Sequence, residues 1–164
     1  MNFDKKQFYL KLQLELIWWF ITAIIVYMVI YPIINNMVKY EFLISNIIFV
    51  TVFITYSRFI FLLKHTFLAY FQAAKFVLIF MSIPLIFKLI EWVFNYQSFL
   101  QTEGLQSFTT FFKPNINYQT KQQLLNYMSR EFLFFGVAAV IAAVVLPFRL
   151  LISYWRVYNK KGTV

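Results

Sequence analysis

Long apolar stretches, separated by short polar ones, dominate this chain. Four of them approach 20 residues, the length that a helix needs to cross about 30 Å of hydrocarbon at about 1.5 Å per residue. The runs are continuous rather than alternating, which argues against membrane-spanning strands. The pattern therefore predicts an all-α integral membrane protein, a bundle of four transmembrane helices. The expected spans are Leu14 to Ile34, Phe42 to Leu63, Phe76 to Phe94 and Phe132 to Ile152.

The links between these runs predict how the helices are connected. The link from Asn35 to Glu41 is short, so the first two helices should be antiparallel neighbours. The stretch from Lys64 to Lys75 has apolar positions at helical spacing, which fits a short helix lying in the membrane interface. A continuation of the second helix beyond the membrane fits equally well.

The segment from Asn95 to Glu131 is the longest stretch outside the four runs, and we expect an outward-facing helical and aromatic loop here. Gly104 is placed to end a short helix that contains Leu100. Thr120 and Gln123 have the spacing of a capping box, which predicts that the fourth helix begins near Lys121 and projects outward. Three aromatic residues of the loop are expected to pack at the interface: Phe108, Phe111 and Phe112.

Basic residues near the ends of the runs predict the orientation, because the cytoplasmic side of a membrane protein carries the excess. Ten lie on the side of the two termini: Lys5, Lys6, Lys11, Arg58, Lys64, Lys75, Arg149, Arg156, Lys160 and Lys161. Five lie on the other side: Lys39, Lys88, Lys113, Lys121 and Arg130. We therefore expect one membrane domain, residues 1–164, in an inner or plasma membrane with both termini in the cytoplasm.

Composition supports this class and excludes several others. Apolar residues make up 62% of the chain and charged residues 13%, whereas about a quarter of an ordinary soluble chain is charged. The absence of cysteine excludes disulfides and thiolate chemistry. The net charge of +9 is spread along the edges of apolar runs, which favours anionic lipid headgroups at the inner face over nucleic acid as a partner.

Ionisable residues inside the expected spans are costly and therefore candidates for function. Arg58 and Arg149 each lie near the inner end of a span, where a long side chain can extend to lipid phosphates. A functional alternative groups both with His65 in a pocket for an anionic headgroup or a carboxylate. His65 is the single histidine, so the chain offers no pair of imidazoles for haem, and we expect no metal or cofactor.

Lys88 and Glu91 are three residues apart on the third expected span, and therefore on one face of a helix. One interpretation is a structural ion pair near the headgroups. The other follows from Pro84, one turn earlier, which frees a backbone carbonyl and would suit a kinked site of the kind that small transporters use.

The fourth span carries small residues on one face: Gly136, Ala139 and Ala143. Small faces allow close helix packing, so this face is expected either to pack within the chain's own bundle or to contact a second subunit. No catalytic constellation is apparent. We therefore expect a non-enzymatic membrane protein that binds a partner protein or a lipid, as accessory, assembly and immunity proteins do. The alternative is a small transporter or oligomeric pore with a pathway past Lys88 and Glu91.

Overall fold

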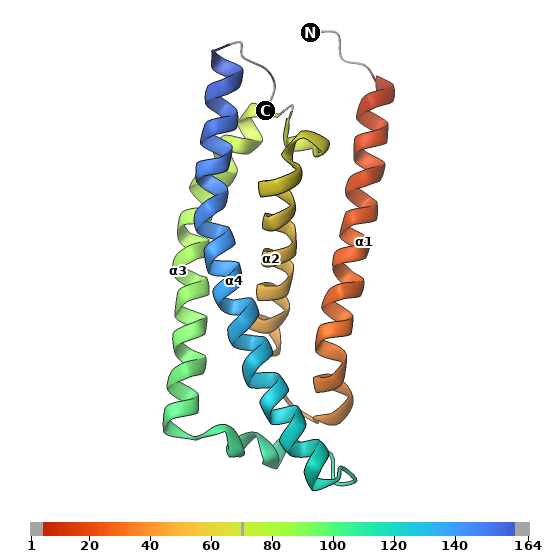
Figure 1. Cartoon of the computed structure of the whole chain (residues 1–164), viewed down its shortest axis with the longest axis vertical. Helices are drawn as coiled ribbons and strands as arrows, with labels where there is room; N and C mark the ends of the chain where they lie inside the picture. The colour runs from red at the N-terminus through yellow and green to blue at the C-terminus, as the bar shows by residue number, and fades with distance from the viewer. Residues whose placement is uncertain (1–4, 70, 160–164) are drawn as a thin grey trace.

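Four long helices make up most of the chain and lie side by side (Figure 1). The computed structural model describes residues 5–69 and 71–159, and this described part contains no β-strand. All four helices are long and apolar enough to cross a membrane. Their bounds are α1 Lys5–Asn36, α2 Leu43–Leu62, α3 Gln72–Thr102 and α4 Tyr118–Tyr158.

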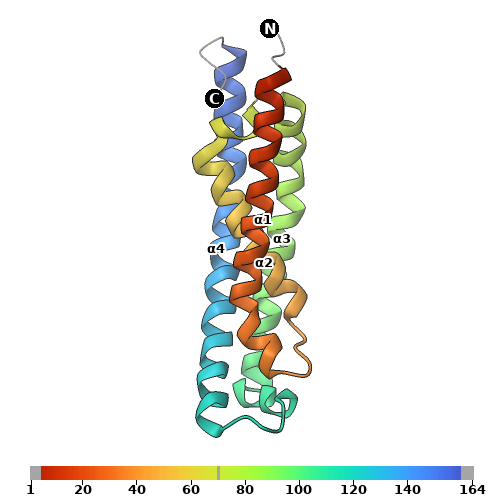
Figure 2. The same ribbon diagram turned by 90° about the vertical axis from the view of Figure 1, so that its right-hand side faces the viewer.

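Successive helices run in opposite directions, so the start of α1 and the end of α4 lie at the same end of the molecule (Figure 1). We call this the terminal end. The opposite end, the loop end, holds the turn between α1 and α2 and the connection between α3 and α4. Figure 2 shows these two connections next to each other.

The segment predicted as a loop, residues 95–131, is mostly helical extension. The last turns of α3 cover residues 95–102, and α4 begins at Tyr118, close to the expected start near Lys121. Between them lies the 3-10 helix η3, Leu105–Phe111. Leu100 belongs to α3, so the separate short helix was wrong. Gly104 follows the end of α3 with φ 76°, a left-handed backbone conformation that favours glycine.

The predicted capping box does not form at the start of α4. The residue before the helix is Asn117, which makes no side-chain capping bond, and Thr120 already lies inside the helix. Because α4 has 41 residues, it extends for about 60 Å, about twice the hydrocarbon thickness. Its first turns therefore project well beyond the apolar part of the other helices.

The connection between α2 and α3 is neither an interfacial helix nor a continuation of α2. Two 3-10 turns, η1 (Leu63–His65) and η2 (Phe67–Ala69), turn the chain back toward the other helices. Leu63, Leu68 and Ala69 are buried there. The burial of these apolar side chains explains why the chain bends instead of extending as a straight amphipathic helix.

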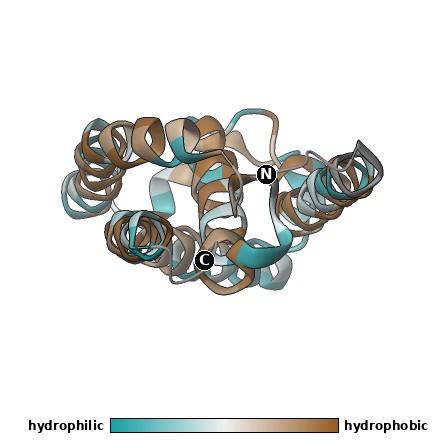
Figure 3. Ribbon diagram, turned by 90° about the horizontal axis from the view of Figure 1, so that it is seen from above, coloured by the Kyte–Doolittle hydropathy of each residue, from teal (hydrophilic) through white to brown (hydrophobic). Residues whose placement is uncertain are grey.

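Helix α4 packs on α2 and α3, while α1 lies to one side, as the view from above shows (Figure 3). Close approach of α4 depends on Gly136: an added Cβ would lie 2.9 Å from Val93 Cγ2 and 3.3 Å from Phe49 Cε2. Ala139 and Ala143 are fully buried. The small-residue face of α4 is therefore occupied inside the chain.

The connection before α4 packs on the turn between α1 and α2. Val38 N donates to Phe111 O at 2.8 Å, and Lys113 N donates to Asn36 O at 3.1 Å. Phe108 and Phe112 are buried, whereas Phe111 is half-buried. Backbone bonds and aromatic side chains together hold the loop end closed.

Candidate functional site

An aromatic cluster fills the loop end and surrounds the first candidate site. Phe42, just before α2, contacts Tyr96 of α3 and Phe132 of α4 with ring centroids 5.0 and 5.8 Å apart. Tyr96 and Phe132 stack at 4.0 Å. Phe108 of η3 adds a fourth ring, 6.2 Å from Phe42. These contacts bring α2, α3, α4 and η3 together around an apolar interior.

A carboxylate lies in this apolar interior. Glu131, in the fourth turn of α4, is only 7% exposed, and its Oε2 accepts a hydrogen bond from Asn46 Nδ2 at 2.7 Å. Asn46, in the first turn of α2, is fully buried. Within the described part of the chain, Glu131 has no basic side chain within ion-pair distance. The carboxylate is therefore held by a neutral amide alone.

Four buried oxygen atoms in this region lack a hydrogen-bond partner: Glu131 Oε1, Asn46 Oδ1 and the hydroxyls of Tyr40 and Tyr96. Burial, and the nearby Tyr96 and Glu131, raise the pKa of Tyr40, so its hydroxyl keeps its proton. We call Tyr40, Asn46 and Glu131 the polar cluster. An unpartnered buried oxygen costs about 1–3 kcal/mol, so these atoms are suited to a ligand that donates hydrogen bonds.

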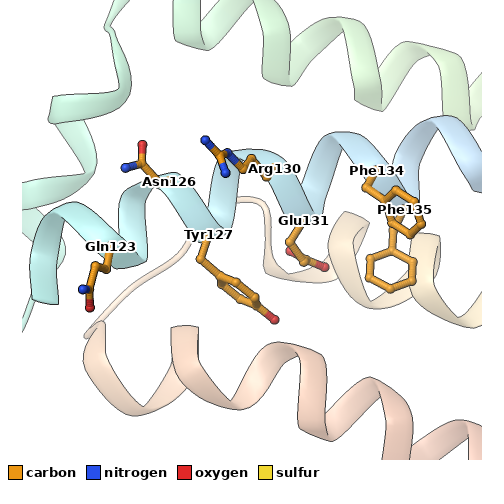
Figure 4. Close-up of a pocket in the computed structure, with 7 residues that line it drawn as sticks. All are labelled: Gln123, Asn126, Tyr127, Arg130, Glu131, Phe134 and Phe135. Carbon is orange, nitrogen blue, oxygen red and sulfur yellow. The ribbon is translucent and has the colours of Figure 1, made fainter.

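Glu131 also lines an open groove of about 660 Å³ along α4, which we call the α4 groove. In Figure 4, Glu131 and Tyr127 point toward α2 and α1, while Arg130 and Asn126 point the other way. The Tyr127 hydroxyl donates to Val29 O at 2.7 Å and ties α4 to α1. The lining residues are Gln123, Asn126, Tyr127, Arg130, Glu131, Phe134 and Phe135.

The lining of the α4 groove changes from polar to apolar along the helix axis. Toward the loop end it offers amides, a phenol and a guanidinium, and beyond Glu131 it offers Phe134 and Phe135. From residue 132 to residue 148 the helix has no charged side chain. Glu131 and Arg149 are thus separated by about 27 Å along α4, close to the hydrocarbon thickness. An amphiphilic ligand would match this gradient.

A second buried polar site, the ion pair of Glu15 and Arg58, lies nearer the terminal end. Arg58 Nη2 is 2.6 Å from Glu15 Oε1, and both side chains are 6% exposed. The guanidinium carbon also lies 5.4 Å from the Trp18 ring and 5.5 Å from the Phe59 ring. Arg58 is therefore enclosed by protein, and the prediction that it extends to lipid phosphates was wrong.

The predicted pocket of Arg58, Arg149 and His65 is not assembled as a ligand site. Arg149 is half-buried, and its Nε donates to Ile60 O at 3.1 Å. His65 is exposed in η1. Lys75 is the fully buried cation at this end, and its Nζ donates to Ser153 Oγ at 2.8 Å and to Ala69 O at 3.2 Å. These bonds fix the connection between α2 and α3.

Lys88 and Glu91 form an exposed pair on α3. Lys88 Nζ lies 2.9 Å from Glu91 Oε1, and the side chains are 50% and 53% exposed. Lys88 Nζ is also 5.7 Å from the Trp92 ring. The pair therefore lies on the outer surface of the helices, where it offers no enclosed path between them.

The sequence interpretation missed Glu15, Asn46, Glu131 and Lys75 as site residues. Two of these four residues carried a usable signal, because the chain has only six acidic residues and Glu15 and Glu131 adjoin apolar runs. Asn46 and Lys75 resemble ordinary polar residues at span ends.

The chain matches no protein-family model, no curated protein and no solved structure.

Proposed function

We propose that this protein is an integral membrane protein with four spanning helices and that it acts by binding a ligand or partner at the α4 groove. The loop end would face away from the cytoplasm and the terminal end toward it. The excess of basic residues at the terminal end supports this orientation.

One observation carries the binding proposal: a carboxylate that is almost fully buried forms part of the wall of an open groove and has no cation beside it in the described chain. Burial of a charge is costly unless it is paired. For a purely structural role, an amide or an apolar side chain at this position would have a lower desolvation cost. The retained carboxylate therefore supports a role in recognition.

Binding rather than catalysis is supported by the neighbours of Glu131. Acid–base sites built on carboxyl groups commonly use two of them, one as acid and one as base or nucleophile. Glu131 is bonded to an amide, whereas Glu91 is bonded to Lys88 and lies on α3. The transporter alternative receives less support, because Lys88 and Glu91 are half-exposed.

Photo-crosslinking in native membranes tests the proposal. A photoreactive phenylalanine replaces Phe134, at the rim of the α4 groove, or Phe148, farther along the same helix; both side chains are 62% exposed, so Phe148 is a matched control. We expect the Phe134 position to give a discrete adduct, lipid or protein, and the Phe148 position to give only bulk lipid. Identical adducts at both positions would remove the proposal.

A further inference from the structure

The α4 groove and the polar cluster together have the chemistry of a zwitterionic lipid headgroup. We propose that the groove binds a phospholipid with a primary amine, with its ammonium group at Glu131 and Asn46 and its phosphate at Arg130. This inference rests on the proposed function and names the class of ligand.

The ammonium position follows from the unpartnered oxygens. A primary ammonium has three N–H donors and a positive charge. Glu131 Oε1, on a residue that lines the groove, and Asn46 Oδ1, on the residue bonded to Glu131, are two buried acceptors without partners. A bound ammonium would favour the ionised form of the Glu131 carboxyl. Glu131 accepts from Asn46 through Oε2, which leaves Oε1 available to an N–H donor that enters the groove lined by Glu131. A quaternary ammonium has no N–H and leaves both acceptors unsatisfied.

The phosphate position follows from Arg130. It is exposed at the rim of the α4 groove, points away from Glu131 (Figure 4), and forms no ion pair within the described part of the chain. Guanidinium groups bind phosphate through paired hydrogen bonds. Arg130 and Glu131 leave α4 on different sides, so the exposed Arg130 side chain would turn across the rim of the groove to reach the phosphate of a lipid whose ammonium lies at Glu131.

The acyl chains would lie beside Phe134 and Phe135. These rings follow Glu131 on α4 toward the centre of the uncharged stretch 132–148. Arg130 and Glu131 are the last charged residues before this stretch, which places them at the headgroup level of a membrane that α4 crosses. The order of polar and apolar groups along the helix thus agrees with the order within a phospholipid.

Competition between headgroups tests the inference. Delipidated protein in detergent is titrated with dilauroyl phosphatidylethanolamine, phosphatidylcholine or phosphatidylglycerol, and bound lipid is counted by native mass spectrometry. We expect the ethanolamine lipid to bind about tenfold more tightly than the choline lipid, the difference for one charge-assisted hydrogen-bonding group. Equal binding of the ethanolamine and choline lipids would overturn the inference.

Two variants assign the roles of Glu131 and Arg130. Glu131→Gln keeps the size of the side chain but removes the charge, and we expect the preference for ethanolamine over choline to fall below about twofold. Arg130→Gln should weaken the binding of the ethanolamine and the choline lipid about equally, because both carry a phosphate. Glu91→Gln is the matched control and should change neither the headgroup preference nor the affinity for either lipid. A preference that survives Glu131→Gln would overturn the inference.

The crosslinking experiment distinguishes failure of this inference from failure of the proposed function. A lipid adduct at Phe134 without a preference for the amine headgroup leaves the proposed function standing and removes only this inference. A protein adduct at Phe134 also removes the inference. Identical adducts at Phe134 and Phe148 remove the proposed function itself.

Discussion

Two carboxyl groups are buried among the residues that the structure describes, those of Glu15 and Glu131, and their surroundings differ. Glu15 meets Arg58 in an enclosed ion pair at 2.6 Å, between two rings that face the guanidinium. Glu131 meets only Asn46, at 2.7 Å, and lies beside an open groove. Glu15 is thus neutralised within the chain and serves to join α1 to α2. Glu131 has only an amide as its hydrogen-bond partner, so the described part of the chain supplies no cation to neutralise it.

The largest effect should come from breaking the pair of Glu15 and Arg58. Arg58→Met leaves the Glu15 carboxylate enclosed without its cation, and we expect the free energy of unfolding in detergent to fall by about 3–5 kcal/mol. The double variant Glu15→Gln/Arg58→Met should recover most of this loss. A loss below about 1 kcal/mol in the single variant would show that the pair contributes little.

A second effect concerns the packing that positions Glu131. Gly136→Ala places a methyl group 2.9 Å from Val93 Cγ2 and 3.3 Å from Phe49 Cε2, so the Val93 side chain or α4 itself must shift. We expect a loss of about 1–3 kcal/mol in thermal or denaturant unfolding. Val137→Ala, at an exposed neighbouring position, should cost less than about 0.5 kcal/mol. An equal loss in the free energy of unfolding for the two variants would contradict the close helix contact at Gly136.

A smaller effect is expected at Glu131 itself. Glu131→Gln removes a charge that has no cation nearby and keeps an oxygen for Asn46, so unfolding should change by less than about 1 kcal/mol, in either direction. Glu15→Gln, the same change at the paired site, should cost about 3 kcal/mol because it leaves Arg58 enclosed. If both variants lose the same stability, the contrast between the two carboxylates is wrong.

The smallest effect is expected at Lys88 and Glu91. Their pair is half-exposed, and such pairs contribute about 0–1 kcal/mol. Glu91→Gln should therefore leave thermal unfolding unchanged within about 0.5 kcal/mol. It should also leave ion flux in liposomes unchanged, if any flux is measured. Loss of a measured flux in this variant would favour the transporter alternative.

The helices were largely predictable because local sequence decides them. Four apolar runs of sufficient length predict four helices, and the structure confirms helices long and apolar enough to span a membrane. Their ends were less predictable. The outward extension of α4 was predicted from about Lys121, whereas the extension of α3 through residues 95–102 was not; packing of Tyr96 on Phe132 and of Phe99 on Phe108 stabilises these extensions.

The candidate sites were harder to predict because their members are distant in sequence. Glu131 and Asn46 are 85 residues apart, and neither position has a local pattern that names its partner. Arg58 was identified as unusual, but its partner Glu15 lies on another helix. The sequence indicates that burying a charged residue is costly, but any oppositely charged or polar residue that the fold brings near can offset this cost.

The sequence by itself determined four long apolar helices and an expected orientation, since these follow from hydropathy and charge along a single chain. The tertiary structure alone decided which charges are neutralised. Helix packing set Arg58 against Glu15 and left Glu131 with an amide at the edge of a groove. Electrostatic pairing depends on distances across helices, and those distances are fixed only when the apolar faces have packed.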